Sequence, residues 1–193
     1  MFLQLIISVT VMDFLYYWMH RCEHYFGFLW ASHYVHHSSP YFNSFVSIRP
    51  SLFQFLYFPL FMIPLFFLPF NLDVIINSIA FGKIYSLFTH YECSPHFVEK
   101  YCGWLFVTPK LHKIHHACNK KYVDKNFGGV FIIWDKLFRT YVNKADDIKL
   151  GVGNGNNYSF LTGVFGGFYY IKNKLAKKKS FMSKVKSIIF MKV

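Results

Sequence analysis

The sequence carries the pattern H-x-x-H-H twice, as His33-Tyr34-Val35-His36-His37 and as His112-Lys113-Ile114-His115-His116. On a helix, positions i, i+3 and i+4 share one face. Each copy can therefore present two or three imidazoles toward one point. His20 and His24 are also one helical turn apart, and a lone His90 lies between the two copies. These spacings predict a site built from helices that bring imidazole rings together.

Nine of the ten histidines fall into this pattern: His20, His24, His33, His36, His37, His90, His112, His115 and His116. One metal ion takes about four to six ligands, so nine imidazoles are too many for one ion. Two ions with four or five imidazoles each fit the count better. His96 follows Pro95 in an expected loop and is not counted among the ligands.

Four further residues are candidates for orienting the imidazoles, because a ligating imidazole usually donates its other N–H to an acceptor. Asp13 lies seven residues before His20 and roughly 10 Å along the helix axis, so we expect it to orient a histidine of another helix. The alternative for Asp13 is a structural cap. Asp124 and Asn126 are weaker candidates, and so is Glu23, since such residues are more often on the surface or at caps.

The composition indicates a membrane protein. The chain is 54% hydrophobic and 22% aromatic, and its formal net charge is +12. All of this excess lies after residue 90, because the first 90 residues hold three basic and three acidic residues. A basic protein can bind nucleic acid, but here long apolar segments precede the basic half. We therefore expect anionic lipid headgroups as the partner, and no nucleic acid.

Residues 1–19 are predicted to form a transmembrane helix, since about 20 apolar residues cross a bilayer. The segment has no basic start and no small-residue cleavage site, so it does not resemble a signal peptide. Because the chain begins inside this helix, we expect an N-terminal part to precede it. Residues 51–90 are predicted to form a transmembrane hairpin with arms near 51–68 and 73–90. A re-entrant hairpin that does not cross is the alternative.

The hairpin returns the chain to the side on which the first helix ends. The 18 basic residues after residue 90 then lie on that side, which the positive-inside rule assigns to the cytosol. We therefore expect the histidines at the membrane–cytosol boundary, with residues 100–150 as a cytosolic cap. Gly128-Gly129 predicts a turn or a close backbone approach.

Residues 143–193 are predicted to be a connector and a basic amphipathic tail. Residues 151–157, G-V-G-N-G-N-N, form the expected flexible connector. Eight lysines alternate with apolar residues between Lys172 and Val193, which is typical of a helix lying in the membrane interface. A disordered, solvated tail is the alternative.

Other residues around the histidines complete a larger pattern: D-F-L-Y-Y-W-M-H-R (13–21), L-W-A-S-H (29–33), H-H-S-S (36–39), T-P (108–109), D-K-N-F-G-G (124–129) and W-D-K-L-F (134–138). Together these motifs resemble the fatty acid hydroxylase and sterol desaturase superfamily of membrane di-iron oxygenases. The resemblance covers residues 10–142. Within the superfamily it is strongest to bacterial-type sterol desaturases and alkylglycerol monooxygenases.

The resemblance implies two iron ions that use dioxygen to attack an unactivated C–H bond of a membrane lipid. It leaves hydroxylation, desaturation and ether cleavage open, and fatty acyl chains, sterols and related lipids as substrates. The sequence carries no flavin, haem or dinucleotide motif. Electrons are therefore expected from an external donor, such as a b-type cytochrome or a ferredoxin.

The sequence as a whole predicts an all-α integral membrane protein, with transmembrane helices and a cytosolic helical cap that hold a histidine-rich di-metal site. We expect a non-haem di-iron lipid oxidoreductase, in the endoplasmic reticulum if the source is eukaryotic and in the inner membrane if it is bacterial. The active site would face the cytosol. The alternatives are a non-catalytic zinc-binding or scaffolding membrane protein, and an inactive, N-terminally truncated family member.

Overall fold

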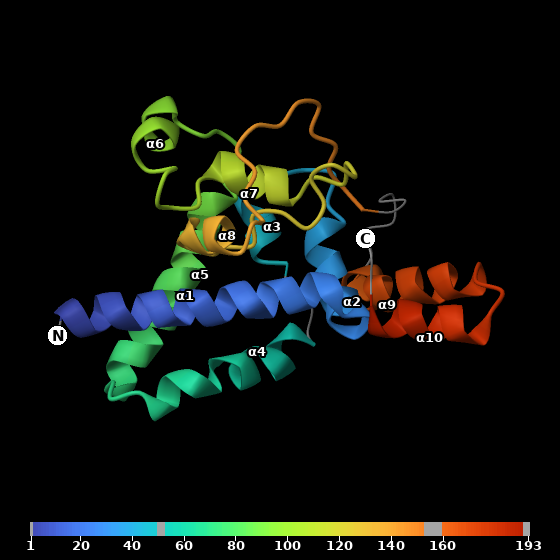
Figure 1. Ribbon diagram of the computed structural model, residues 1–193, viewed down its shortest axis with the longest axis horizontal. Helices are drawn as coiled ribbons and strands as arrows, with labels where there is room; N and C mark the ends of the chain where they lie inside the picture. Colours follow the sequence, from blue (N-terminus) through green and yellow to red (C-terminus); the bar gives the residue numbers. More distant parts are fainter. Residues whose placement is uncertain (1, 50–52, 153–159, 191–193) are drawn as a thin grey trace.

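A computed structural model of the protein describes residues 2–49, 53–152 and 160–190 (Figure 1). Within these ranges the chain is helical and has only two isolated β-bridges besides its helices. The helices are α1 (Phe2–Tyr25), α2 (Gly27–His37), α3 (Ser44–Ser47), α4 (Gln54–Met62), the 3₁₀ helix η1 (Ile63–Phe67), α5 (Leu72–Thr89), α6 (His96–Tyr101), α7 (Pro109–His115), α8 (Ile133–Leu137), α9 (Phe160–Ala176) and α10 (Phe181–Ile189). The predicted all-α class is confirmed.

The first helix extends past its predicted end at residue 19 and includes His20 and His24. It ends where Phe26 adopts an extended conformation, with φ −96° and ψ 128°. Main-chain hydrogen bonds continue across this joint, from Phe26 N to Cys22 O and from Trp30 N to Phe26 O, both 2.8 Å. The bend is therefore tight, and it folds α2 back toward the histidines of α1.

Two helices, α1 and α5, are long and apolar enough to cross a membrane. They cross each other closely, because a Cβ atom at Gly82 of α5 would lie 2.8 Å from Met12 Cε of α1. The first arm of the predicted hairpin is different. It is helical only over Gln54–Phe67 and changes from α to 3₁₀ at Ile63, so it is shorter than the predicted arm and is not a candidate span. The predicted turn between the arms is present, since η1 ends at Phe67 and α5 begins at Leu72.

The remaining helices surround α1. Figure 1 shows α4 on one side of α1, α6 to α8 on the other, and α9 and α10 at the end opposite the N-terminus. The segment with α6 to α8 has its own small core of Val107, Leu111 and Ile132. Thr108 caps α7 by accepting a hydrogen bond from Leu111 N, and Pro109 occupies the first turn, where proline is tolerated. The Thr-Pro motif thus marks the start of the helix that carries His112 and His115 and is followed directly by His116.

The C-terminal residues from 160 to 190 form two helices, α9 and α10, and not the disordered tail that was the alternative. The first, α9, packs on α2, where the rings of Tyr34 and Tyr170 stack at 4.8 Å. The backbones approach so closely there that a Cβ atom at Gly167 would lie 1.8 Å from Ala31 O. Most of the predicted connector, residues 153–157, lies outside the described residues.

Candidate metal centre

The nine predicted ligands form two groups in space. The five-histidine group consists of His20, His24, His33, His37 and His115. The four-histidine group consists of His36, His90, His112 and His116. Within each group, one ring nitrogen per residue lies within 4.8 Å of all the others. His96 begins α6 and belongs to neither group. The numbers match the predicted division into four and five imidazoles.

Each H-x-x-H-H motif is shared between the two groups. The residues four apart point together, so His33 and His37 of α2 join the five-histidine group while His36 joins the other. On α7 the division is reversed, because His112 and His116 join the four-histidine group and His115 the other. Helices α2 and α7 therefore hold both groups at a set spacing.

Four of the rings have a fixed tautomer, because their Nδ1 atoms face backbone carbonyls that can only accept a hydrogen bond. The pairs are His20 with Phe127 O (2.8 Å), His36 with Val46 O (3.0 Å), His90 with Ser86 O (2.7 Å) and His115 with Lys125 O (2.8 Å). In each neutral ring the proton is then on Nδ1. The Nε2 atom is left with a lone pair aimed at the other histidines.

These lone pairs converge at distances that suit a shared cation. His36 Nε2 and His90 Nε2 are 3.1 Å apart, and neither can donate to the other in the neutral form. In the five-histidine group, Nε2 of His33 lies 3.1 Å from that of His20 and 3.0 Å from that of His37. Facing lone pairs repel unless a positive ion lies between them. Imidazole nitrogens suit iron, copper, zinc and nickel, so the residues present fit a pair of transition metals.

Burial keeps the rings in the form that binds metal. Desolvation, followed by the field of neighbouring imidazoles, lowers the pKa of His33, His37 and His116 well below its ordinary value. Desolvation also lowers the pKa of His90 to about 4. Neutral imidazole, not imidazolium, is the species with a free lone pair. The imidazoles therefore remain neutral and able to bind metal throughout the physiological pH range.

Two carboxylates lie against ligand rings. Glu23 Oε2 is 3.3 Å from His33 Nδ1, and Asp124 Oδ1 is 3.3 Å from His24 Nδ1. Both distances are in ion-pair range, but neither contact is a hydrogen bond, since Glu23 Oε2 and His24 Nδ1 have no hydrogen-bond partner. Asp124 is a predicted orienting residue. Glu23 was a weaker candidate from the sequence, as Asp124 was, and it is fully buried.

Glu23 also connects the histidines to α4. Its Oε1 accepts hydrogen bonds from Tyr57 Oη (2.6 Å) and Gln54 Nε2 (2.9 Å). A buried carboxylate within an apolar helix, one residue before a ligand, was the sequence signal for this role. The signal was weak because Gln54 and Tyr57 lie more than 30 residues further along the chain.

Asp13 does not contact a histidine, so the predicted direct role is wrong. Its carboxylate accepts hydrogen bonds from Val130 N (2.7 Å), Phe131 N (2.8 Å) and Trp134 Nε1 (2.9 Å). The physical reason is its distance along α1 from His20, which brings it level with the turn after Gly129. A Cβ atom at Gly129 would lie 2.7 Å from Asp13 Oδ1, which confirms the predicted close backbone approach.

The turn anchored by Asp13 continues into a loop that serves the five-histidine group. This cap loop, residues 124–127, provides Asp124 Oδ1, Lys125 O and Phe127 O to three different ligand rings. The side chain of Asn126 fixes the middle of this loop. Its Nδ2 donates hydrogen bonds to Leu111 O (3.0 Å) and Val142 O (2.7 Å), and its Oδ1 accepts one from Val142 N (2.9 Å). Asn126 therefore acts through the loop and not on a ring.

Asp135 is a second anchor of the same loop, and sequence reasoning missed it. Its two oxygens accept hydrogen bonds from Phe127 N (2.7 Å) and Gly128 N (2.8 Å). It also accepts one from Thr140 Oγ1 (2.6 Å). Its place in the W-D-K-L-F motif was the available signal.

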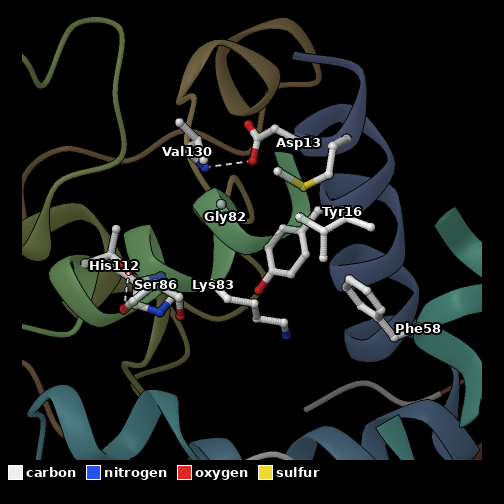
Figure 2. A pocket seen from close by; sticks show the side chains of 12 residues that line it. Asp13, Tyr16, Phe58, Gly82, Lys83, Ser86, His112 and Val130 are labelled. Atoms are coloured by element: carbon white, nitrogen blue, oxygen red, sulfur yellow. Dashed lines mark hydrogen bonds between the residues drawn. The ribbon is translucent and has the colours of Figure 1, made fainter. Parts of the chain in front are cut away.

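A cavity of about 140 Å³ reaches His24. Two other cavities adjoin the histidines and share lining residues. The larger, about 410 Å³, reaches His33 and His36, one from each group, and opens past the exposed residues Ile48, Phe55 and Ile84. The smaller, about 40 Å³, reaches His112 and is shown in Figure 2. Three residues line both cavities: Tyr16, Lys83 and Ser86. A ligand in the larger cavity would therefore lie beside both groups.

Comparison with protein families identifies the class of protein that this fold and site define. Residues 5–140 match the fatty acid hydroxylase family. The chain belongs to this family, as the motifs around the histidines predicted. The relatives that match this chain are named as alkylglycerol monooxygenases and an ornithine lipid hydroxylase.

Particular relatives are similar over most of this chain. It is 36% identical over 143 residues to the alkylglycerol monooxygenase of Danio rerio and 35% identical over 144 residues to that of Homo sapiens. These matches cover 72% of this chain but only 31% of each relative. The ornithine lipid hydroxylase OlsE of Rhizobium tropici is 29% identical over 154 residues, which are 78% of this chain and 45% of OlsE. No solved structure matches significantly.

Proposed function

We propose that this protein hydroxylates a membrane lipid, inserting one oxygen atom of dioxygen into a C–H bond at a two-iron site. The carrying observation is the pair of adjacent histidine groups, whose unprotonated Nε2 atoms converge beside one cavity. The relatives' names support oxygen insertion over desaturation, since they are a monooxygenase and a hydroxylase.

The nine histidines would hold the two irons, five on one ion and four on the other. Iron bound there supplies the activation of dioxygen that an unactivated C–H bond requires. The chain's own contribution is to keep each ring neutral and oriented. Backbone carbonyls such as Phe127 O and Ser86 O hold the Nδ1 protons, so the Nε2 atoms stay directed at the ions. Such outer contacts typically contribute about 10–100-fold to metal affinity or activity.

The reaction needs a source of electrons outside the sequence described. Inserting one oxygen atom of dioxygen and reducing the other to water consumes two electrons and two protons. An electron-donor protein, such as a b-type cytochrome or a ferredoxin, would supply the electrons.

The lipid would reach the site through the larger cavity. Its opening is formed by apolar side chains that are mostly exposed, with Ile48 at 64%, Phe55 at 63% and Ile84 at 67%. An apolar rim of this kind suits an alkyl chain entering from a bilayer. His33 and His36 lie on the wall, so a chain carbon can lie next to both groups.

We place the site at the membrane–cytosol boundary. The support is the basic second half of the chain together with the two candidate spans. The pair α9 and α10 would contact anionic lipid headgroups. Lysines and exposed apolar residues such as Phe181 and Met182 are present there together.

The test combines metal analysis with lipid chemistry. The protein is purified without oxygen, reconstituted with iron, and supplied with membrane lipids, an electron donor and isotope-labelled dioxygen. We expect two irons per chain and a lipid that gains one labelled oxygen atom. The His115→Ala variant is the matched negative control, and His96→Ala is the control for removing an imidazole outside both groups.

The competing function is a non-catalytic zinc site or scaffold. This alternative is favoured if the folded protein binds zinc, does not bind iron on reconstitution and leaves every lipid unchanged. A hydroxylated product without labelled oxygen would also contradict our proposal, because its oxygen would then come from water, and so would a desaturated product, which gains no oxygen.

A further inference from the structure

Helix α5 carries a charge inside its apolar length. Its charged residues are Asp73, in the first turn, and Lys83, in the interior. A basic side chain in the middle of a membrane helix is costly and usually marks a functional position. Lys83 has no part in the histidine groups, so its place in the fold needs a separate explanation.

Lys83 is exposed, and its side chain lines the cavities beside α1 and α4. The neighbouring Gly82 packs on Met12 of α1, and Lys83 Nζ lies 4.7 Å from the centre of the Phe58 ring of α4. Figure 2 shows Lys83 among the side chains of the smaller cavity, with Tyr16 and Phe58. Lys83 also lines the larger cavity together with His33 and His36. Its side chain is accessible, and both cavities give access to it.

No carboxylate forms an ion pair with Lys83 in the described part of the chain. The acidic group whose field reaches it is Glu23. That carboxylate already accepts hydrogen bonds from Tyr57 and Gln54 and lies beside the ring of His33. The ammonium group of Lys83 therefore retains hydrogen-bonding capacity toward the cavity. An anion is the ligand that would satisfy it.

A simple alternative is a lysine whose ammonium group extends along the helix surface to water. Lysines near helix ends do this. Lys83 is seven residues before His90, roughly 10 Å along the axis. Lys83 is exposed, but its ammonium group lies over the Phe58 ring of α4 and its side chain lines both cavities. These contacts favour a ligand in the cavity.

We propose that Lys83 binds the anionic group of the lipid substrate, a carboxylate or a phosphate, and so selects charged lipids over neutral ones. This inference rests on the proposed function. The cavity of about 410 Å³ contains both Lys83 and the two histidines. It is too small for the long chains of a whole membrane lipid, so the polar end fills it and the chain extends past the apolar rim. The oxidised carbon is then close to the anionic group.

Binding of matched lipids to the purified full-length chain tests this without turnover. The probes are hexadecyl phosphate, hexadecanoate and hexadecanol, which share one chain length and differ in the polar end. We expect the unaltered protein to bind at least one anionic probe about tenfold tighter than hexadecanol, as suits a charge-assisted hydrogen bond. The tighter anion identifies phosphate or carboxylate as the natural group.

Three variants decide the role of Lys83. Lys83→Gln should bind all three probes alike, and Lys83→Arg should keep the preference for the anion. Lys100→Gln removes an equal charge from the exposed surface of α6 and should change nothing. Equal binding of hexadecanol by the unaltered protein would overturn the inference, and so would an intact preference in Lys83→Gln. Because no oxidation is measured, failure of the two-iron proposal would not alter these results.

Discussion

The two histidine groups consist of the same residue type and share two helices. They differ in which parts of the chain accept the hydrogen bonds that orient their rings. The four-histidine group is oriented locally: His90 donates to Ser86 O within its own helix end, and His36 to Val46 O ten residues later. The five-histidine group depends on distant chain, since His20 donates to Phe127 O, 107 residues away. Two further rings of that group, His24 and His115, also face the cap loop 124–127.

This difference separates what each group needs in order to form. The four-histidine group requires α2, the end of α5 and α7 in place. The five-histidine group requires in addition that the cap loop be closed, and this depends on Asp13, Asp135 and Asn126. We infer that substitutions that disturb the cap loop should weaken metal binding by the five-histidine group and leave that of the four-histidine group unchanged.

The largest effect should come from removing a ligand from one group at a time. We expect His115→Ala to lose the ion of the five-histidine group and His36→Ala that of the four-histidine group. Each variant should retain one metal per chain by elemental analysis and have no turnover. His96→Ala should retain both ions and full activity. Loss of both ions from either single variant would show that the groups do not fill separately.

The next effect should come from Asp13→Asn. An amide can accept only at its oxygen and places an NH₂ group against the backbone donors Val130 N and Phe131 N. We expect the five-histidine group to bind metal about 10–100-fold more weakly. Chelator titration in the His36→Ala background, where only that group remains, measures it.

The matched measurement uses the His115→Ala background, where only the four-histidine group remains. There Asp13→Asn should leave the metal affinity unchanged. Asp73→Asn, which removes an exposed charge from the first turn of α5, is the control for charge alone. Equal weakening of both groups would remove the distinction between local and distant orientation.

The smallest effect should come from Asp124→Asn. Asparagine keeps an acceptor for His24 and tolerates the left-handed φ of 60° found there. We expect less than about a tenfold loss of metal affinity, below the usual range for lost outer contacts. Asp124→Ala should lose more, because it removes the acceptor and strains the backbone.

Asp147 offers the matched control for this pair, since its φ of 50° is also left-handed and its side chain is exposed. Asp147→Ala should reproduce the backbone strain without changing metal affinity. If it weakens binding as much as Asp124→Ala, the effect at Asp124 is strain and not contact with His24.

The sequence by itself determined the features that depend on local periodicity. The i, i+3, i+4 spacing predicted which histidines come together and how many they are, because helical residues four apart share a face whatever the fold. Apolar length marked α1 and α5, and Pro69 and Asn71 marked the turn between the hairpin arms, because bilayer thickness and backbone sterics act on short segments. The family motifs extended this to the class of protein.

Only the tertiary structure decided which ring belongs to which histidine group, and what orients each ring. Those contacts join Glu23 to Tyr57, Asp13 to Val130 and His20 to Phe127, and no local pattern encodes such pairs. The same applies to Lys83, whose charge is plain in the sequence but whose cavity is made by α1, α4 and α5 together. Position along one helix fixes a residue's face, whereas packing between helices fixes what that face meets.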